Sequence, residues 1–348
     1  MRAMVLEEIG RPLILRDIPC PEPKPSEVRI KIHACGVCRT DLHIVDGELP
    51  HPKLPLILGH QVVGIIDKPG EDASKHRIGD RVGVPWLGGC CHTCEFCVSG
   101  RENLCDRAIY TGYMKDGGYA EYCTAHEDFV LELPQNDDDL HTAPLLCAGL
   151  IGYRAFRLAG RTKTIGFYGF GSSAHILIQV ALSLGCEVYV FTRPGDEKTQ
   201  AFARSLGAKW AGGSDQLPPV GLDAALIFAP VGALYPQALK AVKKGGRVIS
   251  AGIHMSDIPS FPYELLWEER SLSSVANLTR KDGVDFMQLV KKLPLKVSVN
   301  AFTLEKANEA LTAIRRGTIE GSAVLIIHNS NRMKECLKYF DLNSGEML

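Results

Sequence analysis

The spacing of hydrophobic and polar positions differs between the two halves of the chain. Up to about residue 147, short apolar runs are broken by glycine and proline, as in VRIKIHACGVC (28–38) and LGHQVVGIIDKPG (58–70). Runs of this kind, bounded by turn residues, are typical of β-strands. GDRVGVPW and YAEYCTAHEDFVLELP continue the pattern. We therefore expect antiparallel sheets or a small barrel in this part.

From about residue 150, strands and helices alternate. The predicted strands are KTIGFYGFG, CEVYVFTR, LDAALIFAP and RVISAG. The predicted helices are SAHILIQVALSLG, TQAFARSLGA and ALYPQALKAVKKGG, the last of which is expected to close on Gly245 and Gly246. Regular alternation of this kind predicts a doubly wound parallel sheet with helices on its faces.

After about residue 277 the pattern loosens, and FTLEKANEALTAIRRGTIEGSAVLII predicts one helix followed by a closing strand. The polar residues from Ser330 onward suggest a loosely held extension. We therefore expect a first domain over residues 1–148, a second over 149–276, and a return to the first domain over 277–348.

Composition narrows the class of protein. The chain has 348 residues, 45% of them hydrophobic and 23% charged, which is typical of a soluble globular protein of about two domains. Its 39 basic and 40 acidic residues nearly cancel, so no charge field favours a nucleic acid or an anionic membrane as partner. MRAMVLEEIG does not resemble a signal peptide, and no apolar run approaches the ~18 residues of a membrane span. We expect a cytoplasmic α/β protein.

Five of the twelve cysteines lie in CCHTCEFCVSGRENLC (90–105). Disulfides are disfavoured in a reducing compartment, so thiols at this spacing indicate a metal site or a redox pair. Cys91, Cys94, Cys97 and Cys105 can enclose a tetrahedral Zn²⁺ with no open position, which predicts a structural zinc. An unmetallated thiol cluster and an iron–sulfur site are the alternatives. Cys90 is expected to be a bystander.

GFGSSA fits G-x-G-x-x-A between a predicted strand and a predicted helix, the context of a dinucleotide site. Gly169 permits the tight turn, Gly171 lets the backbone approach a pyrophosphate, and Ala174 allows close helix packing.

The next strand ends at Thr192 and Arg193, where an NAD site usually has an acidic residue. Because arginine suits a ribose phosphate, we predict NADP, with NAD as the alternative if Asp196 reaches the ribose.

The motifs together resemble one family. GVCRTDLH, LGHQVVG, the four-cysteine stretch, DGGYAEY, LLCAGLIGY, GFGSSA and GGRVISAG follow one another as in the zinc-dependent medium-chain alcohol dehydrogenases, of the microbial alcohol dehydrogenase or aldehyde reductase type. The resemblance implies an α/β protein with a β-rich GroES-like catalytic domain and a Rossmann coenzyme domain. It also implies two zinc ions per chain.

By this resemblance, Cys38, His60 and Cys147 bind a catalytic zinc and leave its fourth position open. Asp41 would contact a zinc ligand and orient it. Gln61 departs from the family, which usually has glutamate after the zinc-binding histidine. A neutral amide cannot approach the metal as an anion.

The resemblance implies hydride transfer between a primary alcohol or aldehyde and the nicotinamide. Thr40 would take the alcohol proton and pass it through the ribose to His43. Arg39 would meet the pyrophosphate, and Trp86 and Leu87 would line the substrate pocket.

Other readings stay open at this point. A polyol or secondary-alcohol dehydrogenase is the neighbouring activity. A zinc-ribbon nucleic-acid module and an inactive descendant of an enzyme are the alternatives from other classes. A homotetramer is expected by analogy, with a dimer as the alternative.

Overall fold

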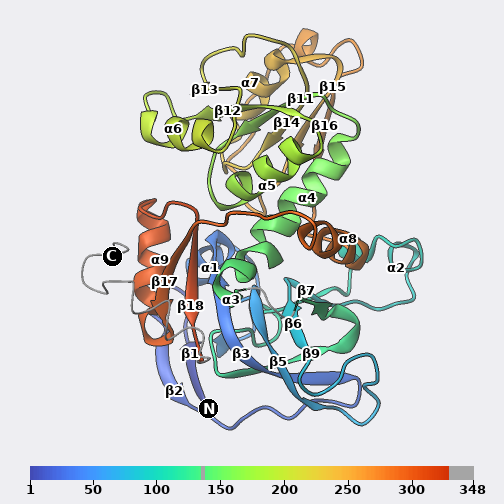
Figure 1. The fold of residues 1–348 in the computed structure, drawn as a ribbon, viewed down its shortest axis with the longest axis vertical. Coiled ribbons are helices and arrows are strands. Elements are labelled where there is room, and N and C mark those ends of the chain that lie inside the picture. The colour runs from blue at the N-terminus through green and yellow to red at the C-terminus, as the bar shows by residue number, and fades with distance from the viewer. Residues whose placement is uncertain (135–137, 329–348) are drawn as a thin grey trace.

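The computed structural model describes residues 1–134 and 138–328, and the extension expected from Ser330 lies outside them. The strands fall into two units, stacked along the long axis in Figure 1. An N-terminal unit contains β1–β10 together with β17 and β18, and a central unit contains β11–β16.

The N-terminal unit is built around β3 (Glu27–Val37), whose alternate residues are buried. This strand pairs antiparallel with β5 (Val62–Pro69), β9 (Tyr122–His126) and β18 (Ser322–Ile326). The late strands β17 and β18 therefore lie beside the N-terminal strands (Figure 1). The expected antiparallel sheets and the expected closing strand are confirmed.

The strands paired with β3 belong to a seven-stranded sheet, which also contains β6 (Arg81–Val84), β10 (Leu131–Glu132) and β17 (Val299–Thr303). A three-stranded sheet contains β1 (Arg2–Leu6), β2 (Ile14–Asp17) and β4 (Leu56–Ile57), and a two-stranded sheet pairs β7 (Leu87–Gly89) with β8 (Ile109–Tyr110). The helices of this unit are α1 (Arg39–Val45), α2 (Glu95–Val98), α3 (Asp139–Thr142) and α9 (Ala307–Arg316), with short 3₁₀ turns η1 (Glu102–Leu104), η2 (Glu127–Phe129), η3 (Ala143–Leu146) and η5 (Leu304–Lys306).

The central unit is a six-stranded sheet in the order β13-β12-β11-β14-β15-β16, and all five pairings are parallel. Its strands are β11 (Thr164–Tyr168), β12 (Glu187–Thr192), β13 (Trp210–Gly213), β14 (Leu222–Ile227), β15 (Val242–Ser250) and β16 (Ser271–Ser274). Every residue of β11 is buried, because helices cover both faces of a parallel sheet. The doubly wound order is that of dinucleotide-binding sheets, so the predicted fold class is confirmed.

The connecting helices of this region are α4 (Ala148–Ala159), α5 (Ser172–Ser183), α6 (Glu197–Ser205), α7 (Leu234–Ala241) and α8 (Arg280–Val290), with the 3₁₀ turn η4 (Tyr263–Leu265). α4 contacts α5, β14 and β15 of the central unit and η3 of the N-terminal unit, so it bridges the two. None of the described helices is long and apolar enough to cross a membrane.

The predicted end of one helix was wrong. The helix expected to close on Gly245 and Gly246 ends at Ala241, and Val242 already belongs to β15. Gly245 has a φ of +70°, so the chain turns there within the segment assigned to the strand. The short edge strands β13 and β16 and the polar helix α8 were not expected, since WAGG, SLSS and RKDGVDFMQLV show little apolar periodicity.

Candidate active site

Two cysteines of the predicted catalytic set begin helices. Cys38 is the N-cap of α1, and Cys147 is the N-cap of α4. A helix N-terminus carries a partial positive charge, which stabilises an anion held there, such as a metal-bound thiolate. His60 follows Gly59, whose φ of +99° turns the chain just before β5. The ligand atoms of Cys38, His60 and Cys147 all lie within 4.8 Å of one another.

The close contacts in this group suit a cation. Cys38 Sγ lies 3.2 Å from His60 Nε2. Its hydrogen bond with Cys147, together with burial, raises the pKa of Cys38 well above its ordinary value. Burial alone would lower the pKa of His60, but the neighbouring Cys38 and Asp41 raise it to about 10. Raised pKa values for both groups mean that this site favours positive charge, and two thiols with one imidazole match the ligand set of an open zinc site.

Asp41 lies directly behind this group. Its Oδ2 accepts a hydrogen bond from Cys38 N at 2.9 Å, and its Oδ1 lies 3.5 Å from His60 Nδ1. Gln61 is 2% exposed, and its Nε2 has no hydrogen-bond partner among the described residues. Gln61 is thus a buried amide beside His60 whose donor group is unsatisfied among the described residues.

The predicted relay residues lie on α1, which contains Arg39, Thr40 and His43. Arg39 and His43 line a pocket of about 250 Å³ that is also lined by His254 of the central unit. The His43 and His254 rings are 5.2 Å apart, and His43 Nδ1 is hydrogen bonded to Glu48. This bond lowers the pKa of Glu48.

Sequence reasoning missed Glu48 and His254. Glu48 follows His43 at a spacing that belongs to none of the motifs described above. His254 comes from a distant loop that follows β15, so no local pattern connects it to α1.

The two predicted pocket residues face different surroundings. Trp86 is 6% exposed, and its ring meets the His60 ring edge-on at 4.8 Å. Tyr110 and Tyr113 stack against the same indole. Leu87 packs in a small hydrophobic cluster with the four-cysteine stretch. Trp86 thus borders the His60 group, whereas Leu87 lies on the side of the cysteines.

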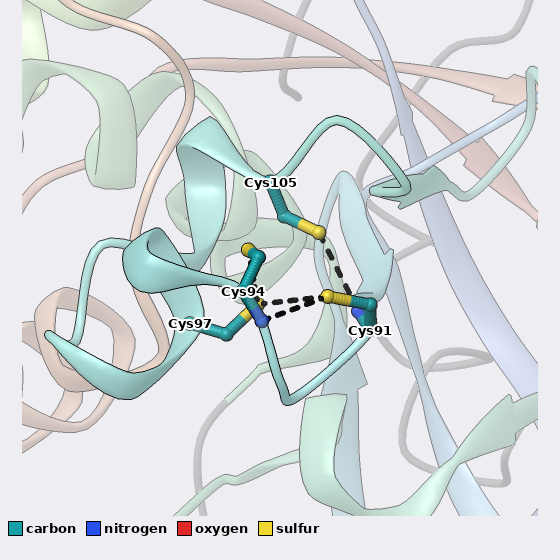
Figure 2. A group of neighbouring side chains, drawn as sticks. All are labelled: Cys91, Cys94, Cys97 and Cys105. Atoms are coloured by element: carbon teal, nitrogen blue, oxygen red, sulfur yellow. Dashed lines mark hydrogen bonds between the residues drawn. The ribbon is translucent and has the colours of Figure 1, made fainter.

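The second thiol group comes from one loop, residues 91–105, which we call the cysteine lobe. Figure 2 shows its four thiols directed toward one another. Cys91 Sγ lies 3.8 Å from Cys97 Sγ, and Cys94 Sγ lies 3.5 Å from Cys97 Sγ. Zn–S bonds of about 2.3 Å in a tetrahedron would separate the sulfurs by about 3.8 Å. The spacing therefore fits zinc.

The electrostatic interactions among the thiols of the lobe also suit a bound cation. Hydrogen bonds from Thr93 and from Cys94 N lower the pKa of Cys91 to about 5. Desolvation and neighbouring thiols raise the pKa of Cys97 to about 11. Adjacent thiolates repel one another, so four of them would be stabilised by a cation held between them. The described cysteines form no disulfides.

The dinucleotide motif has the expected backbone. Gly169 has a φ of +93°, and a Cβ there would lie 3.0 Å from Ala229. Gly171 is the N-cap of α5, and a Cβ on it would meet no atom within 4 Å. Ala174 is fully buried in the first turn of α5. The space beside Gly171 is what close approach of a pyrophosphate requires.

At the end of β12, Thr192 is buried, and its hydroxyl accepts a hydrogen bond from Gln200 Nε2 at 3.0 Å. Arg193 is exposed, and no carboxylate of the described residues pairs with it. Asp196 caps α6 by accepting from Thr199 N at 3.1 Å. The carboxylate that could have read a free ribose is therefore engaged in helix capping.

A third group, formed by His92, His126 and Asp128, also brings ligand atoms within 4.8 Å. Asp128 is already paired with Lys75 and lies 3.6 Å from Arg280. His126 Nδ1 accepts from Asp128 N at 3.2 Å. Two cations beside the carboxylate oppose metal binding, so we assign no site there.

The chain is similar in sequence to known alcohol dehydrogenases. The family model described as the alcohol dehydrogenase GroES-like domain matches residues 24–135. A probable alcohol dehydrogenase AdhA of Mycobacterium tuberculosis is 43% identical over 318 residues, covering 88% of this chain and 90% of that protein. An alcohol dehydrogenase of Geobacillus stearothermophilus is 36% identical, covering 93% of this chain and 98% of that protein.

Solved structures agree on the fold. A cinnamyl alcohol dehydrogenase of Sorghum bicolor superimposes with a TM-score of 0.85 at 23% identity, covering 93% of this chain and 97% of that one. An alcohol dehydrogenase of Aeropyrum pernix gives 0.84 at 27% identity, covering 94% of this chain and 100% of that one.

A GroES-like unit with Cys/His groups, joined to a dinucleotide-type sheet, defines a zinc-type dehydrogenase. The chain belongs to the zinc-type medium-chain alcohol dehydrogenase family, and it is an alcohol/aldehyde oxidoreductase.

Proposed function

We propose that this enzyme interconverts primary alcohols and aldehydes with NADP(H), using a catalytic metal site formed by Cys38, His60 and Cys147. The observation that carries the proposal is the convergence of these three ligand atoms within 4.8 Å from distant parts of the chain. Three protein ligands leave a fourth position for substrate oxygen, which is typical of catalytic zinc. A zinc ion held there supplies Lewis acidity toward that oxygen.

The chain's own residues would handle the proton and the substrate. Thr40 would accept the alcohol proton, and His43 would carry it to the pocket mouth, with Glu48 holding His43 Nδ1. Arg39 lines the same pocket and would bind the pyrophosphate. Trp86, beside His60, would give the substrate an apolar wall. Hydride transfer itself belongs to the nicotinamide.

The cysteine lobe would hold a second zinc with a structural role, giving two per chain. Its four thiols leave no open coordination position, and the sulfur spacing supports this assignment. We also propose three segments, a catalytic domain over 1–148 and 277–348 and a coenzyme domain over 149–276. The pairing of β18 with β3 supports the return of the chain. A homotetramer in the cytoplasm completes the proposal.

The preference for NADP is proposed from Arg193. Its exposed guanidinium follows β12 where an acidic residue would select NAD, and Asp196 is occupied in capping α6. Structural neighbours include a Helicobacter pylori enzyme complexed with NADP(H) and a Geotrichum candidum acetophenone reductase in complex with NAD, so the fold accommodates either cofactor.

The test is a cofactor-reduction assay over primary, secondary and polyhydric alcohols, with NADP and NAD side by side. Charge-assisted bonds to a phosphate contribute roughly 1.5–3 kcal/mol, or about tenfold to a hundredfold in kcat/KM. We expect NADP to be preferred by this factor and Arg193→Asp to reverse the preference, because the new carboxylate repels the phosphate.

Arg161→Asp is the matched control. Arg161 is an exposed arginine of the same unit that precedes β11, at the opposite ends of the parallel strands from Arg193. It should leave the cofactor ratio unchanged. A wild type that prefers NAD, or an unchanged ratio in Arg193→Asp, would remove Arg193 from phosphate recognition. A higher kcat/KM on polyols than on primary alcohols would replace the proposed substrate class.

A further inference from the structure

The DGGYAEY stretch (116–122) carries part of the family resemblance, yet the proposed function gives Tyr119 no task. Its backbone runs beside the residues that precede His60. Tyr119 N donates to Leu58 O at 2.9 Å, and Gly118 N donates to Gly59 O at 2.9 Å. Tyr119 is thus tied to the segment that ends at a proposed metal ligand.

The Tyr119 ring is also held by packing against Gly59. A Cβ on Gly59 would lie 2.5 Å from Tyr119 Cδ1, so the ring packs directly on that glycine. Gly59 has a φ of +99°, a conformation that other residues rarely adopt. Tyr119 is 0% exposed. A buried phenol held this rigidly presents its hydroxyl in one place.

Three fully buried polar atoms have no hydrogen-bond partner among the described residues: Asp41 Oδ1, His60 Nδ1 and Tyr119 Oη. Asp41 Oδ1 lies 3.5 Å from His60 Nδ1. Burial, with Asp41 adding to it, raises the pKa of Tyr119 well above its ordinary value. A phenol can donate one hydrogen bond and a carboxylate can accept several, so Tyr119 Oη and Asp41 Oδ1 are complementary groups that both lack a partner.

We infer that Tyr119 is a positioning residue for the metal centre: its hydroxyl donates to Asp41, and Asp41 holds His60 so that Nε2 faces the metal. A carboxylate can accept several hydrogen bonds, and Oδ2 is already occupied by Cys38 N at 2.9 Å. Oδ1 is left for the His60 Nδ1–H and the Tyr119 O–H. The inference rests on the proposed function, which assigns His60 as a ligand.

The expected consequence follows from metal-site chemistry. Groups that orient a ligating histidine commonly change metal affinity by about tenfold to a hundredfold when removed. Tyr119 acts one step further away, through Asp41, so its effect should be smaller. Loss of the hydroxyl should loosen Asp41 and thereby His60, while the ring still packs on Gly59.

The experiment uses the full-length zinc-loaded protein and Tyr119→Phe. Zinc release to a chromophoric chelator should become about three- to tenfold faster for one of the two ions, and kcat should fall by a similar factor. The cofactor KM should stay within about twofold, because Gly169 and Gly171 lie on another unit. Tyr168→Phe is the matched control. Tyr168 is a buried tyrosine of the central unit whose hydroxyl donates to Gln237 O, and zinc release should not change there.

The pathway through Asp41 is tested by a double variant. Asp41→Asn alone should release zinc faster than Tyr119→Phe, and adding Tyr119→Phe to it should have no further effect. Additive effects would contradict action through Asp41. Release and kcat at wild-type values in Tyr119→Phe would overturn the inference. So would a Tyr119→Phe protein that circular dichroism shows unfolded, because the hydroxyl would then serve folding.

Failure of the proposed function has a different signature. If His60→Ala keeps full zinc content and full activity, His60 is not a ligand and the metal-centre assignment itself fails. If His60→Ala loses zinc and activity while Tyr119→Phe matches Tyr168→Phe in every readout, the role of Tyr119 alone is removed.

Discussion

The cysteine lobe and the Cys38–His60–Cys147 centre use similar ligands, but the chain builds them in opposite ways. All four thiols of the lobe come from residues 91–105, within one loop. The centre draws one ligand from each of three segments, two of them at helix N-termini and one after a glycine turn. A local group can form wherever its loop folds, whereas a distributed group requires the whole unit to be assembled.

The two groups also differ in how deeply they are buried. His60 and Asp41 are 0% exposed, whereas none of the residues of α2, the helix within the lobe, is buried. At the centre, the Trp86 ring packs on the His60 ring, and Asp41 accepts from Cys38 N and lies 3.5 Å from His60 Nδ1. The lobe is tied to its surroundings at a few points, such as Glu102 Oε1 accepting from Arg280 N at 2.7 Å and Asn103 donating to Ala276 O. This contrast predicts that the centre governs turnover and that the lobe governs stability.

The largest expected effect separates the two roles. His60→Ala should lower kcat by about a thousandfold or more, because Lewis acidity worth several kcal/mol is lost at about 1.4 kcal/mol per tenfold. NADPH binding, followed by fluorescence titration, should stay within about threefold, since the dinucleotide motif lies in the central unit. His141→Ala, which changes a half-exposed histidine paired with Asp138, should leave both quantities unchanged.

Substantial turnover by a His60→Ala protein that metal analysis finds depleted of zinc would break the comparison. The chemistry would then not depend on the distributed centre.

The next effect concerns the lobe. Cys94→Ser should reduce the metal content from two zinc ions to about one and lower the thermal midpoint by about 5–10 °C, because metal binding contributes to folding. Turnover of the protein that stays folded should remain within about threefold. Metal analysis, calorimetry and kinetics on one preparation check all three.

Cys20→Ser is the matched control, since Cys20 is exposed and belongs to neither thiol group. A fully active wild type with one zinc per chain would contradict the two-site assignment. Loss of turnover in Cys94→Ser in proportion to Cys38→Ser would show that the two groups are not functionally distinct.

The same contrast explains how far the sequence could predict the site. The spacing of Cys91, Cys94, Cys97 and Cys105 indicates a metal site unaided, because a local group is written in consecutive residues. Cys38, His60 and Cys147 carry no such spacing, and only the resemblance to a family connected them. Roles for individual residues of either group stay predictions until measured.

The fold shows the same limit. Strands β11, β12 and β14 are mostly buried and rich in apolar residues, and each was expected. β16 reads SLSS and is part of the sheet only because β15 pairs with it. His254 could not be placed near His43 for a related reason: their proximity depends on how the loop after β15 meets α1. Long-range packing decides such contacts, and periodicity does not record it.

The smallest expected effect tests whether Cys90 belongs to the metal-binding thiols of the lobe. Cys90 precedes Cys91 and packs in the same hydrophobic cluster, and it contributes to the raised pKa of Cys97 after desolvation. The four-thiol group nevertheless forms without it, and a tetrahedral ion accepts four ligands. Cys90→Ser should therefore keep both zinc ions and shift the thermal midpoint by no more than about 2 °C, which corresponds to roughly 1.5 kcal/mol for a chain of 348 residues. Loss of one zinc in Cys90→Ser, measured beside Cys94→Ser, would mean that the fifth thiol is a ligand and that one of the other four is the bystander.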